Sequence, residues 1–315
     1  MEEAYIILLV RDILDIVNMR RLINNMKILM KSALKKKELL ARKALNENNI
    51  EIQLFEDFCN EEISLIEYFN TIISSGLNIC VIHTPLVNGE AIEIDRFYEK
   101  RKKSIFFKTC ELSNMLGSRL KKDILVIVHC TMNYKEDINN PNKIKLIDDT
   151  LLYGLNKYQN ISIAIENVIP IVANHSGLYG RDGFLNDNCL YVDYFIDKYG
   201  LKDRIGTVLD TCHALTTIKL LQYCKKFITL DQFFSWNKSN IKLIHLANIG
   251  GNGYGKNNHG TGFIEGEELV LLNDIIKLYF KYNYCCPITI EVIEKEYINP
   301  VNYLTTKENL LKILG

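Results

Sequence analysis

The stretch Ile124-Leu125-Val126-Ile127-Val128-His129 joins five consecutive aliphatic residues to a histidine. A short, continuous apolar run of this kind is typical of a strand that is covered on both faces, as in a parallel sheet. The same pattern, an apolar run that stops at an ionisable residue, recurs along the chain. We therefore predict a sheet of parallel strands that alternate with helices.

Seven runs fit such a strand, and each is followed by a longer helical pattern. The predicted strands are Ile50–Phe55, Asn78–His83, Ile124–His129, Ser162–Glu166, Gly206–Asp210, Lys242–His245 and Pro287–Glu291. The predicted helices are Glu61–Ser74, Ile94–Leu120, Ile144–Tyr158, Leu190–Lys198, Leu215–Cys224, Gly266–Tyr282 and Asn302–Leu314. This alternation favours an α/β fold and, within it, a (β/α)8 TIM barrel.

The beginning of the chain departs from this regularity. An eighth apolar run, Tyr5–Val10, would open the barrel, and Asp12–Asn46 is amphipathic and predicts one or two helices. Residues 1–49 are thus a long helical region with a short first strand or none, which makes the first βα unit atypical. The alternative fold is an open, doubly wound sheet, but no glycine-rich phosphate loop follows the first strand.

Composition limits the classes of protein to consider. The 315 residues are 48% apolar and 24% charged, with five prolines and no linker of low complexity, which favours one domain over residues 1–315. The net charge of zero removes the strongest indication of nucleic-acid binding. Nine cysteines without paired spacing, and no secretory signal, indicate the cytoplasm. Tyr5–Val10 is too short to span a bilayer, so no membrane role is expected. Association into a homo-oligomer is left open, because the sequence does not indicate the oligomeric state.

Potential metal ligands stand where the apolar strands end. Because parallel strands of a barrel end on one face, side chains distant in sequence can share a site there. Mixed imidazole and carboxylate donors suit zinc or manganese better than magnesium or calcium. We therefore predict one to three divalent ions, with ligands drawn from His83, His129, Glu166, Asp210, His213, His245, His259 and Glu291.

Each of these residues also has an ordinary structural interpretation. A single histidine at a strand end often anchors a loop by hydrogen bonding, and an isolated Glu166 or Asp210 can cap the next helix. It is their number and their common position that favour a metal site.

At these residues the chain resembles the xylose isomerase-like TIM barrels, which include sugar-phosphate isomerases and epimerases and endonuclease IV (AP endonuclease family 2). The resemblance spans residues 50–315, in the order of the family. It is carried by Ile82-His83-Thr84-Pro85, Ile127-Val128-His129, Ile165-Glu166-Asn167, Leu209-Asp210-Thr211-Cys212-His213-Ala214, Ile244-His245-Leu246 and Ile290-Glu291.

In the isomerase and epimerase branch, the resemblance implies one metal ion on Glu166, Asp210, His245 and Glu291, with His213 on the substrate. In the endonuclease IV branch it implies His83, His129 and His213 as further ligands and three zinc ions. That branch also has an Asp-x-His pair after the seventh strand. Here His259 is present, but Asn257 replaces the aspartate, and alignment on the Gly-x-Gly pair places Lys256 at the histidine position. The Gly-x-His segment of the family, which approaches DNA, is missing from Tyr5–Val10.

Two chemistries fit this set of residues. As an isomerase or epimerase of a sugar or sugar phosphate, the protein would use Glu166 and Glu291 as base and acid around a metal-stabilised enediolate, and His213 would orient an oxygen. Arg181, Lys256, Asn257 and His259 are then the expected substrate-binding residues.

As a zinc-dependent AP endonuclease, the protein would act on DNA, and Glu166 would bridge two ions. A third interpretation is a non-catalytic barrel stabilised by its metal. The zero net charge and the missing loop residues favour the isomerase interpretation, with nuclease activity as the alternative.

Overall fold

Eight parallel strands close into a barrel in the computed structural model, which describes residues 26–59, 64–87, 90–169, 185–223, 225–250 and 259–315. Around the barrel the strands follow the order β1-β10-β7-β6-β5-β4-β3-β2, and β2 pairs again with β1. Their bounds are β1 (Ile28–Ala33), β2 (Asn49–Gln53), β3 (Asn78–His83), β4 (Ile124–Cys130), β5 (Ile161–Asn167), β6 (Ile205–Asp210), β7 (Ile241–Leu246) and β10 (Ile288–Ile290). The predicted (β/α)8 TIM-barrel fold is confirmed.

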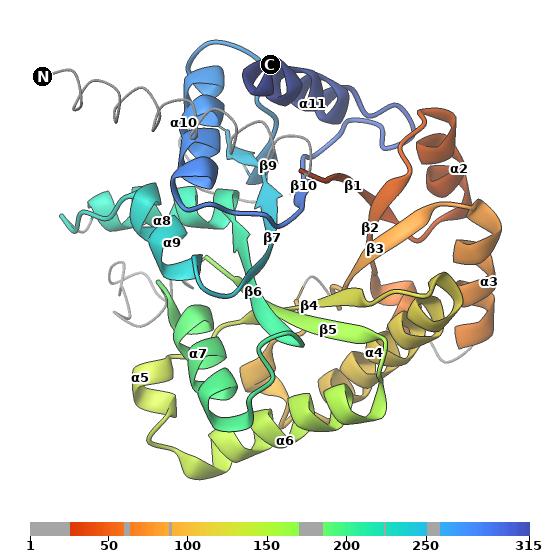
Figure 1. The fold of residues 1–315 in the computed structure, drawn as a ribbon, viewed down its shortest axis with the longest axis vertical. Helices are drawn as coiled ribbons and strands as arrows, with labels where there is room; N and C mark the ends of the chain where they lie inside the picture. The colour runs from red at the N-terminus through yellow and green to blue at the C-terminus, as the bar shows by residue number, and fades with distance from the viewer. Residues whose placement is uncertain (1–25, 60–63, 88–89, 170–184, 224, 251–258) are drawn as a thin grey trace, which may run out of the picture.

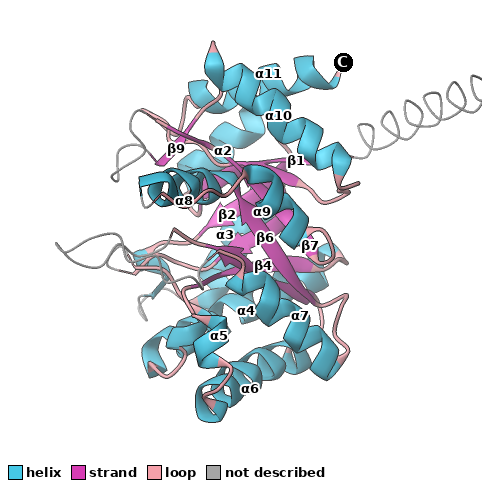
Figure 2. Cartoon of the chain, turned by 90° about the vertical axis from the view of Figure 1, so that its left-hand side faces the viewer, coloured by secondary structure: helices cyan, strands magenta, loops and turns pink. Residues whose placement is uncertain are grey.

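Helices surround the barrel (Figure 1), and the strands cross the middle of the molecule in the perpendicular view (Figure 2). The helices are α2 (Lys36–Ala44), α3 (Leu65–Ser75), α4 (Lys100–Leu120), α5 (Tyr134–Asp137), α6 (Pro141–Lys157), α7 (Asp187–Tyr199), α8 (Thr211–Tyr223), α9 (Leu230–Asn237), α10 (Glu267–Lys281) and α11 (Val301–Leu314). A short antiparallel pair, β8 (Asn248–Ile249) and β9 (His259–Thr261), follows β7. None of the described helices is long and apolar enough to cross a membrane.

The first strand differs from the prediction. Residues 28–33, which we expected to be helical within Asp12–Asn46, form β1, and the helix α2 starts only at Lys36. β1 pairs on one edge with β2 and on the other with β10, so that tertiary hydrogen bonding overrides its amphipathic pattern. Of the two possibilities for residues 1–49, a short first strand or none, the structure shows a strand, at Ile28–Ala33. Tyr5–Val10 lies outside the described residues, and β1 takes the place in the barrel that we assigned to it.

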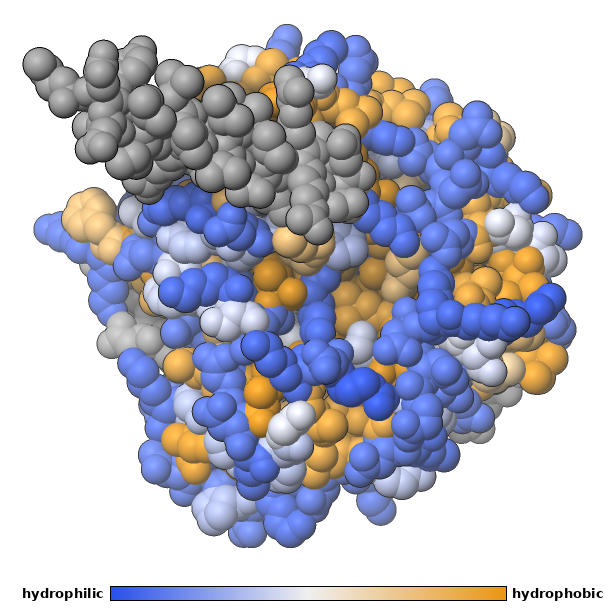
Figure 3. All heavy atoms as spheres, viewed as in Figure 1, coloured by the Kyte–Doolittle hydropathy of each residue, from blue (hydrophilic) through white to orange (hydrophobic). Residues whose placement is uncertain are grey.

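The core has an inner and an outer part. Inside the barrel, a layer of aliphatic side chains lies two residues before Lys31 and the predicted ligands of β3 to β7: Leu29, Val81, Ile127, Ala164, Val208 and Leu243. Outside it, the other faces of the strands pack against the helices in two larger clusters. Hydrophilic side chains cover much of the face shown in Figure 3, with apolar ones in patches between them. This apolar layer lies directly beneath the polar residues at the C-terminal end of the barrel.

Candidate metal centre

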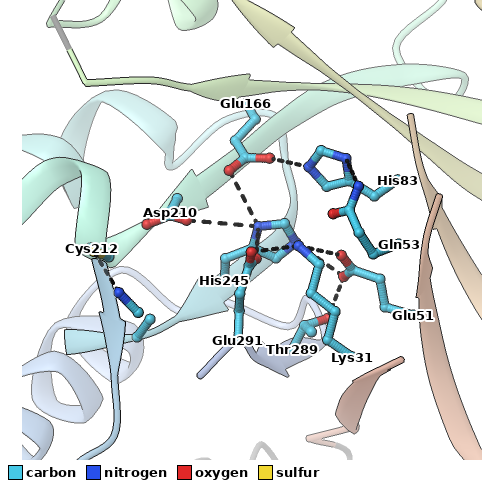
Figure 4. Close-up of polar contacts among 12 residues, drawn as sticks. Lys31, Glu51, Gln53, His83, Glu166, Asp210, Cys212, His245, Thr289 and Glu291 are labelled. Atoms are coloured by element: carbon cyan, nitrogen blue, oxygen red, sulfur yellow. Dashed lines mark hydrogen bonds and ion pairs between the residues drawn. The ribbon is translucent and has the colours of Figure 1, made fainter. Parts of the chain in front are cut away.

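Strand register brings the predicted ligands together at the C-terminal end of the barrel. His129 of β4 lies beside Glu166 of β5, and Asp210 of β6 lies beside His245 of β7. Paired residues of neighbouring strands point to the same side of a sheet, so each pair faces the barrel interior as a unit. Figure 4 shows Glu166, Asp210, His245 and Glu291 directed at one another from three strands and the end of β10.

One group of potential metal-ligand atoms surrounds the Nδ1 atom of His245. This atom lies 2.9 Å from Glu291 Oε2, 3.3 Å from Glu166 Oε1 and 3.9 Å from Asp210 Oδ2. Ligand atoms around a tetrahedral ion with bonds of 2.0–2.2 Å are separated by about 3.3–3.6 Å. Three carboxylate oxygens thus lie within 3.9 Å of one imidazole nitrogen, as ligands of one divalent ion would; by mutual spacing, Glu166 and Asp210 group with His213, and His245 and Glu291 group with Glu51.

Two of these carboxylates are incompletely satisfied. Within the described part of the chain, the buried Asp210 Oδ2 accepts no hydrogen bond, and the buried Glu291 Oε2 has the ion pair with Nδ1 of His245 at 2.9 Å as its one partner. Asp210 Oδ1, by contrast, accepts the backbone N–H of His213 at 2.8 Å in the first turn of α8. Asp210 thus caps a helix with one oxygen and turns the other to the centre. Buried carboxylate oxygens without donors are costly, and a cation would satisfy them.

A second group of potential metal-ligand atoms surrounds the other oxygen of Glu166. Glu166 Oε2 lies 3.1 Å from Nε2 of His83 and 3.4 Å from Nε2 of His129. Nδ1 of His83 lies 2.9 Å from the carbonyl oxygen of Thr84, which can only accept, so the proton of a neutral ring belongs on Nδ1. In that tautomer Nε2 presents a lone pair toward the carboxylate of Glu166, an arrangement that a cation between the two acceptors would stabilise. The residues fit a second ion here, with Glu166 common to both groups.

His213 stands beside the first group. Its Nδ1 lies 2.8 Å from the carbonyl oxygen of Asn167, 3.5 Å from Glu166 Oε1 and 3.6 Å from Asp210 Oδ2. Burial lowers its pKa, but Asp210 and Glu166 outweigh this effect, and the pKa is raised overall. The contact of Nδ1 with the carbonyl oxygen of Asn167 fixes the orientation of the ring beside the first group.

Two further charged residues belong to the centre, and we did not predict either of them. Glu51 of β2 is fully buried; its Oε2 lies 3.0 Å from Nε2 of His245 and accepts the hydroxyl of Thr289 at 2.8 Å. Lys31 of β1 places its Nζ 2.5 Å from Glu291 Oε1 and 3.4 Å from Glu51 Oε1. A carboxylate behind a ligating imidazole fixes its orientation and tautomer. Glu51 thus leaves Nδ1 of His245 for the metal.

A sequence signal existed for Glu51 alone. It stands between two isoleucines of a strand that we predicted, but in the middle of the strand, where we did not search for ligands. The role of Lys31 could not be predicted, because we expected residues 28–33 to form a helix and not a strand.

The charged groups of the centre shift one another's pKa values. Burial would lower the pKa of His245, but Glu51, Glu291 and Glu166 raise it well above its ordinary value. Burial would likewise raise the pKa of Glu291, yet Lys31 and His245 hold it well below its usual range. The pKa of His83 is lowered, by burial and then by Lys31. These shifts describe the protein without bound metal, in which His245 and Lys31 provide the compensating positive charge.

The structure brings together seven of the eight residues predicted as ligands: His83, His129, Glu166, Asp210, His213, His245 and Glu291. The eighth, His259, begins β9, but its side chain lies outside the part that the structure describes. Arg181, Lys256 and Asn257, predicted as substrate-binding residues, also lie outside the described residues.

Comparison with known proteins gives structural matches alone. No protein-family model and no curated protein sequence matches the chain. Among solved structures, a xylose isomerase domain protein from Planctomyces limnophilus is 10% identical, with a TM-score of 0.59, over 91% of this chain and 96% of that one. Endonuclease IV from Thermus thermophilus is 15% identical, with a TM-score of 0.53, over 91% of this chain and 98% of that one.

D-allulose 3-epimerase from Methylomonas sp. is 14% identical, with a TM-score of 0.51, over 92% of this chain and 96% of that one. Structural similarity at such low sequence identity indicates a common fold but not a common activity. The resemblance inferred from the strand-end residues is confirmed at that level. The chain has the fold of the xylose isomerase-like TIM barrels, with buried histidine and carboxylate clusters that suit divalent metal ions at its C-terminal end.

Proposed function

We propose that this protein is a divalent-metal-dependent phosphodiesterase whose centre is bridged by Glu166, and that DNA with an abasic site is the substrate to test first. The observation that carries the proposal is the division of Glu166 between two sets of donors. Its Oε1 faces His245 at 3.3 Å, and its Oε2 faces His83 at 3.1 Å. A carboxylate shared between two cation sites is typical of centres that displace an oxygen at phosphorus.

The residues divide the work as follows. Glu166, Asp210, His245 and Glu291 would hold one ion, and Glu166, His83 and His129 another. Bound divalent ions supply Lewis acidity toward a phosphoryl oxygen and the attacking water. Glu51 keeps His245 in orientation through Nε2, and Lys31 adds a positive charge beside Glu291. His213, whose Nδ1 lies 3.5 Å from Glu166 Oε1 and 3.6 Å from Asp210 Oδ2, is the group placed to carry a proton beside the centre.

Metal content and cleavage test this proposal together. We expect two or more zinc-like ions per chain by elemental analysis, and cleavage of an oligonucleotide at a single abasic site. Glu291→Gln should abolish turnover; because Glu291 pairs with Lys31 and His245 in the metal-free protein, a cooperative unfolding transition in chelator, and not an unchanged melting temperature, shows that the variant folds. Glu265→Gln, an exposed glutamate, is the matched control and should behave as wild type. A single ion per chain together with intact DNA would refute the proposal.

One observation favours a second function, isomerisation or epimerisation of a sugar or sugar phosphate. Glu166 and Glu291 approach the same Nδ1 atom of His245, so two carboxylates face one point, as a base and acid pair would require. This function needs only one ion. Incubation of the metal-loaded protein with ketoses in D2O tests it, because deuterium should enter at the carbon that exchanges its proton. Exchange with wild type but not with Glu166→Gln would support it, and no exchange would exclude it for those sugars.

A further inference from the structure

A cavity of about 340 Å³ adjoins the acidic residues of the centre. It lies at the same end of the barrel, between the ends of β1, β2 and β10 and the helix α2. Lys31 and Glu291 form part of its lining, so a molecule in the cavity reaches the centre directly. Its volume lies within the range of small-molecule sites. Its other walls are largely apolar and include Phe55, Leu86, Ile293, Tyr297 and Pro300.

Arg42 of α2 is the unusual member of this lining. Only 1% of its surface is exposed. Its Nη1 donates to the carbonyl oxygen of Tyr297 at 2.5 Å, but its buried Nε has no acceptor within the described structure. The one described carboxylate within 4.0 Å is that of Glu38, at 4.0 Å from Nη2. A buried guanidinium without a close anion is costly, because its lost hydration is not replaced.

The acidic residues around the cavity are engaged elsewhere. Glu294 accepts the backbone N–H groups of Asn302 at 3.0 Å and Tyr303 at 2.6 Å, at the start of α11. Glu38 accepts the backbone N–H of Ala33 at 3.1 Å. Glu291 is paired with Lys31 and His245. The carboxylates that favour the charged form of Arg42, those of Glu38 and Glu294, therefore compensate it only in part, and no described carboxylate accepts a hydrogen bond from its guanidinium.

We propose that this cavity binds an anionic group, a phosphate or a carboxylate, of the molecule that reaches the metal centre. Arg42 is the anchor, since the planar fork of a guanidinium matches both groups. Lys35, an exposed lysine on the cavity wall, adds a second cation. The link to the centre rests on the proposed function, whereas anion binding by the cavity does not. The apolar walls fit the body of a small molecule that carries the charge.

Direct binding of small anions tests the proposal. Calorimetry would use inorganic phosphate and, separately, acetate, with chloride at matched ionic strength, on protein that is metal-loaded and on protein treated with chelator. We expect phosphate or acetate to bind in both forms and to raise the melting temperature. Arg42→Met should weaken binding about tenfold or more, because a charge-assisted hydrogen bond is lost. Lys37→Met, on an exposed α2 lysine outside the cavity lining, is the control and should bind as wild type.

The outcomes separate anion binding from a structural role of Arg42. If Arg42 serves only to hold Tyr297, Arg42→Met lowers the melting temperature without anion, and no anion binds to wild type; this result overturns the proposal. If Arg42→Met does not fold, Lys35→Met takes its place and should still bind the anion several-fold more weakly than wild type. Wild-type affinity in Lys35→Met would then overturn the proposal. Stronger binding of phosphate or of acetate identifies the group.

The same experiment on Glu166→Gln separates this inference from the proposed function. That variant should keep its affinity for the anion in chelator while turnover is lost. Anion binding without any phosphodiesterase activity in wild type would refute only the proposed function.

Discussion

Glu166 separates two sides of the centre that differ in charge. The histidine side consists of His83 and His129, two imidazoles that share the Oε2 oxygen of Glu166. The acidic side consists of Asp210, His245, Glu291 and Glu51, together with the ammonium of Lys31. One side is therefore nearly neutral apart from the shared carboxylate, and the other carries three carboxylates of its own.

This difference predicts how firmly each side holds a cation. The acidic side attracts any divalent ion through charge, and Lys31 offsets part of that attraction at Glu291. The histidine side depends on imidazole nitrogen, which selects zinc-like ions over magnesium or calcium. We expect the ion on the histidine side to leave first under chelation or acid, because protonation of an imidazole competes with metal at mildly acidic pH.

The largest effect is expected from Glu166→Gln, which removes the charge common to both sides. The amide preserves shape, so the barrel should fold, but neither ion keeps its bridging ligand. We expect turnover to fall by about 10³-fold or more, since several kcal/mol of transition-state stabilisation depend on the metal. Elemental analysis should show loss of more than one ion per chain. Glu267→Gln, an exposed residue of α10, is the control, and wild-type metal content in Glu166→Gln would contradict the bridge.

His129→Ala should damage the histidine side alone. The side chain is only 14% exposed, so its removal leaves a partly buried cavity and costs some stability, which the melting temperature in chelator measures. We expect the ion count to fall by one while the acidic side stays loaded, and turnover to fall by roughly 10²-fold if both ions act on the substrate. Zinc titration followed by calorimetry measures both steps. Two unchanged binding steps would show that His129 is not a ligand.

Glu51→Gln should weaken the acidic side without removing a ligand. Loss of a carboxylate behind a ligating histidine typically reduces metal affinity by about 10–100-fold. Competition with a chromophoric chelator would show this loss in the first, tighter step, with the histidine-side step unchanged. Glu56→Gln, an exposed neighbour, should leave both steps as they are. Equal weakening of both steps would instead indicate that Glu51 supports the barrel as a whole.

The two sides also differ in how far the sequence predicts them. His83 and His129 stand at the ends of long apolar runs, so their strands and their common face could be inferred from local pattern. Lys31 and Glu51 could not be placed in this way. The strand Ile28–Ala33 carries a mixed pattern, and it is extended because β2 and β10 pair with both of its edges. That pairing exists only in the closed barrel.

Helix boundaries show the same limit. We predicted a helix from Leu215, but α8 begins at Thr211, because Asp210 accepts the N–H of His213 and starts the helix earlier. His213 thus belongs to a first helical turn and not to a loop. Ligand types were predictable from strand ends, whereas the hydrogen bonds that orient them depend on residues brought together by the fold.

The smallest effect is a difference in pH dependence between the two sides in protein without metal. The pKa of His245 is raised well above the ordinary value by its carboxylates, whereas burial lowers the pKa of His83. The contribution of His245 to the free energy of unfolding is therefore complete below its unfolded pKa and is lost as pH rises through its folded pKa. The contribution of His83 has the opposite sign: it is present above the unfolded pKa, near 6.5, and is lost as pH falls.

Each residue contributes at most about 1.4 kcal/mol per pH unit, so denaturant unfolding in chelator between pH 5 and 9 can resolve the slopes. We expect His245→Gln to flatten the decrease in stability toward high pH, and His83→Gln to flatten the decrease toward low pH. Lys277→Gln, an exposed residue of α10, should alter neither slope. Identical slopes in the two histidine variants would mean that the acidic residues do not distinguish the two sides, and the division of the centre at Glu166 would lose its electrostatic basis.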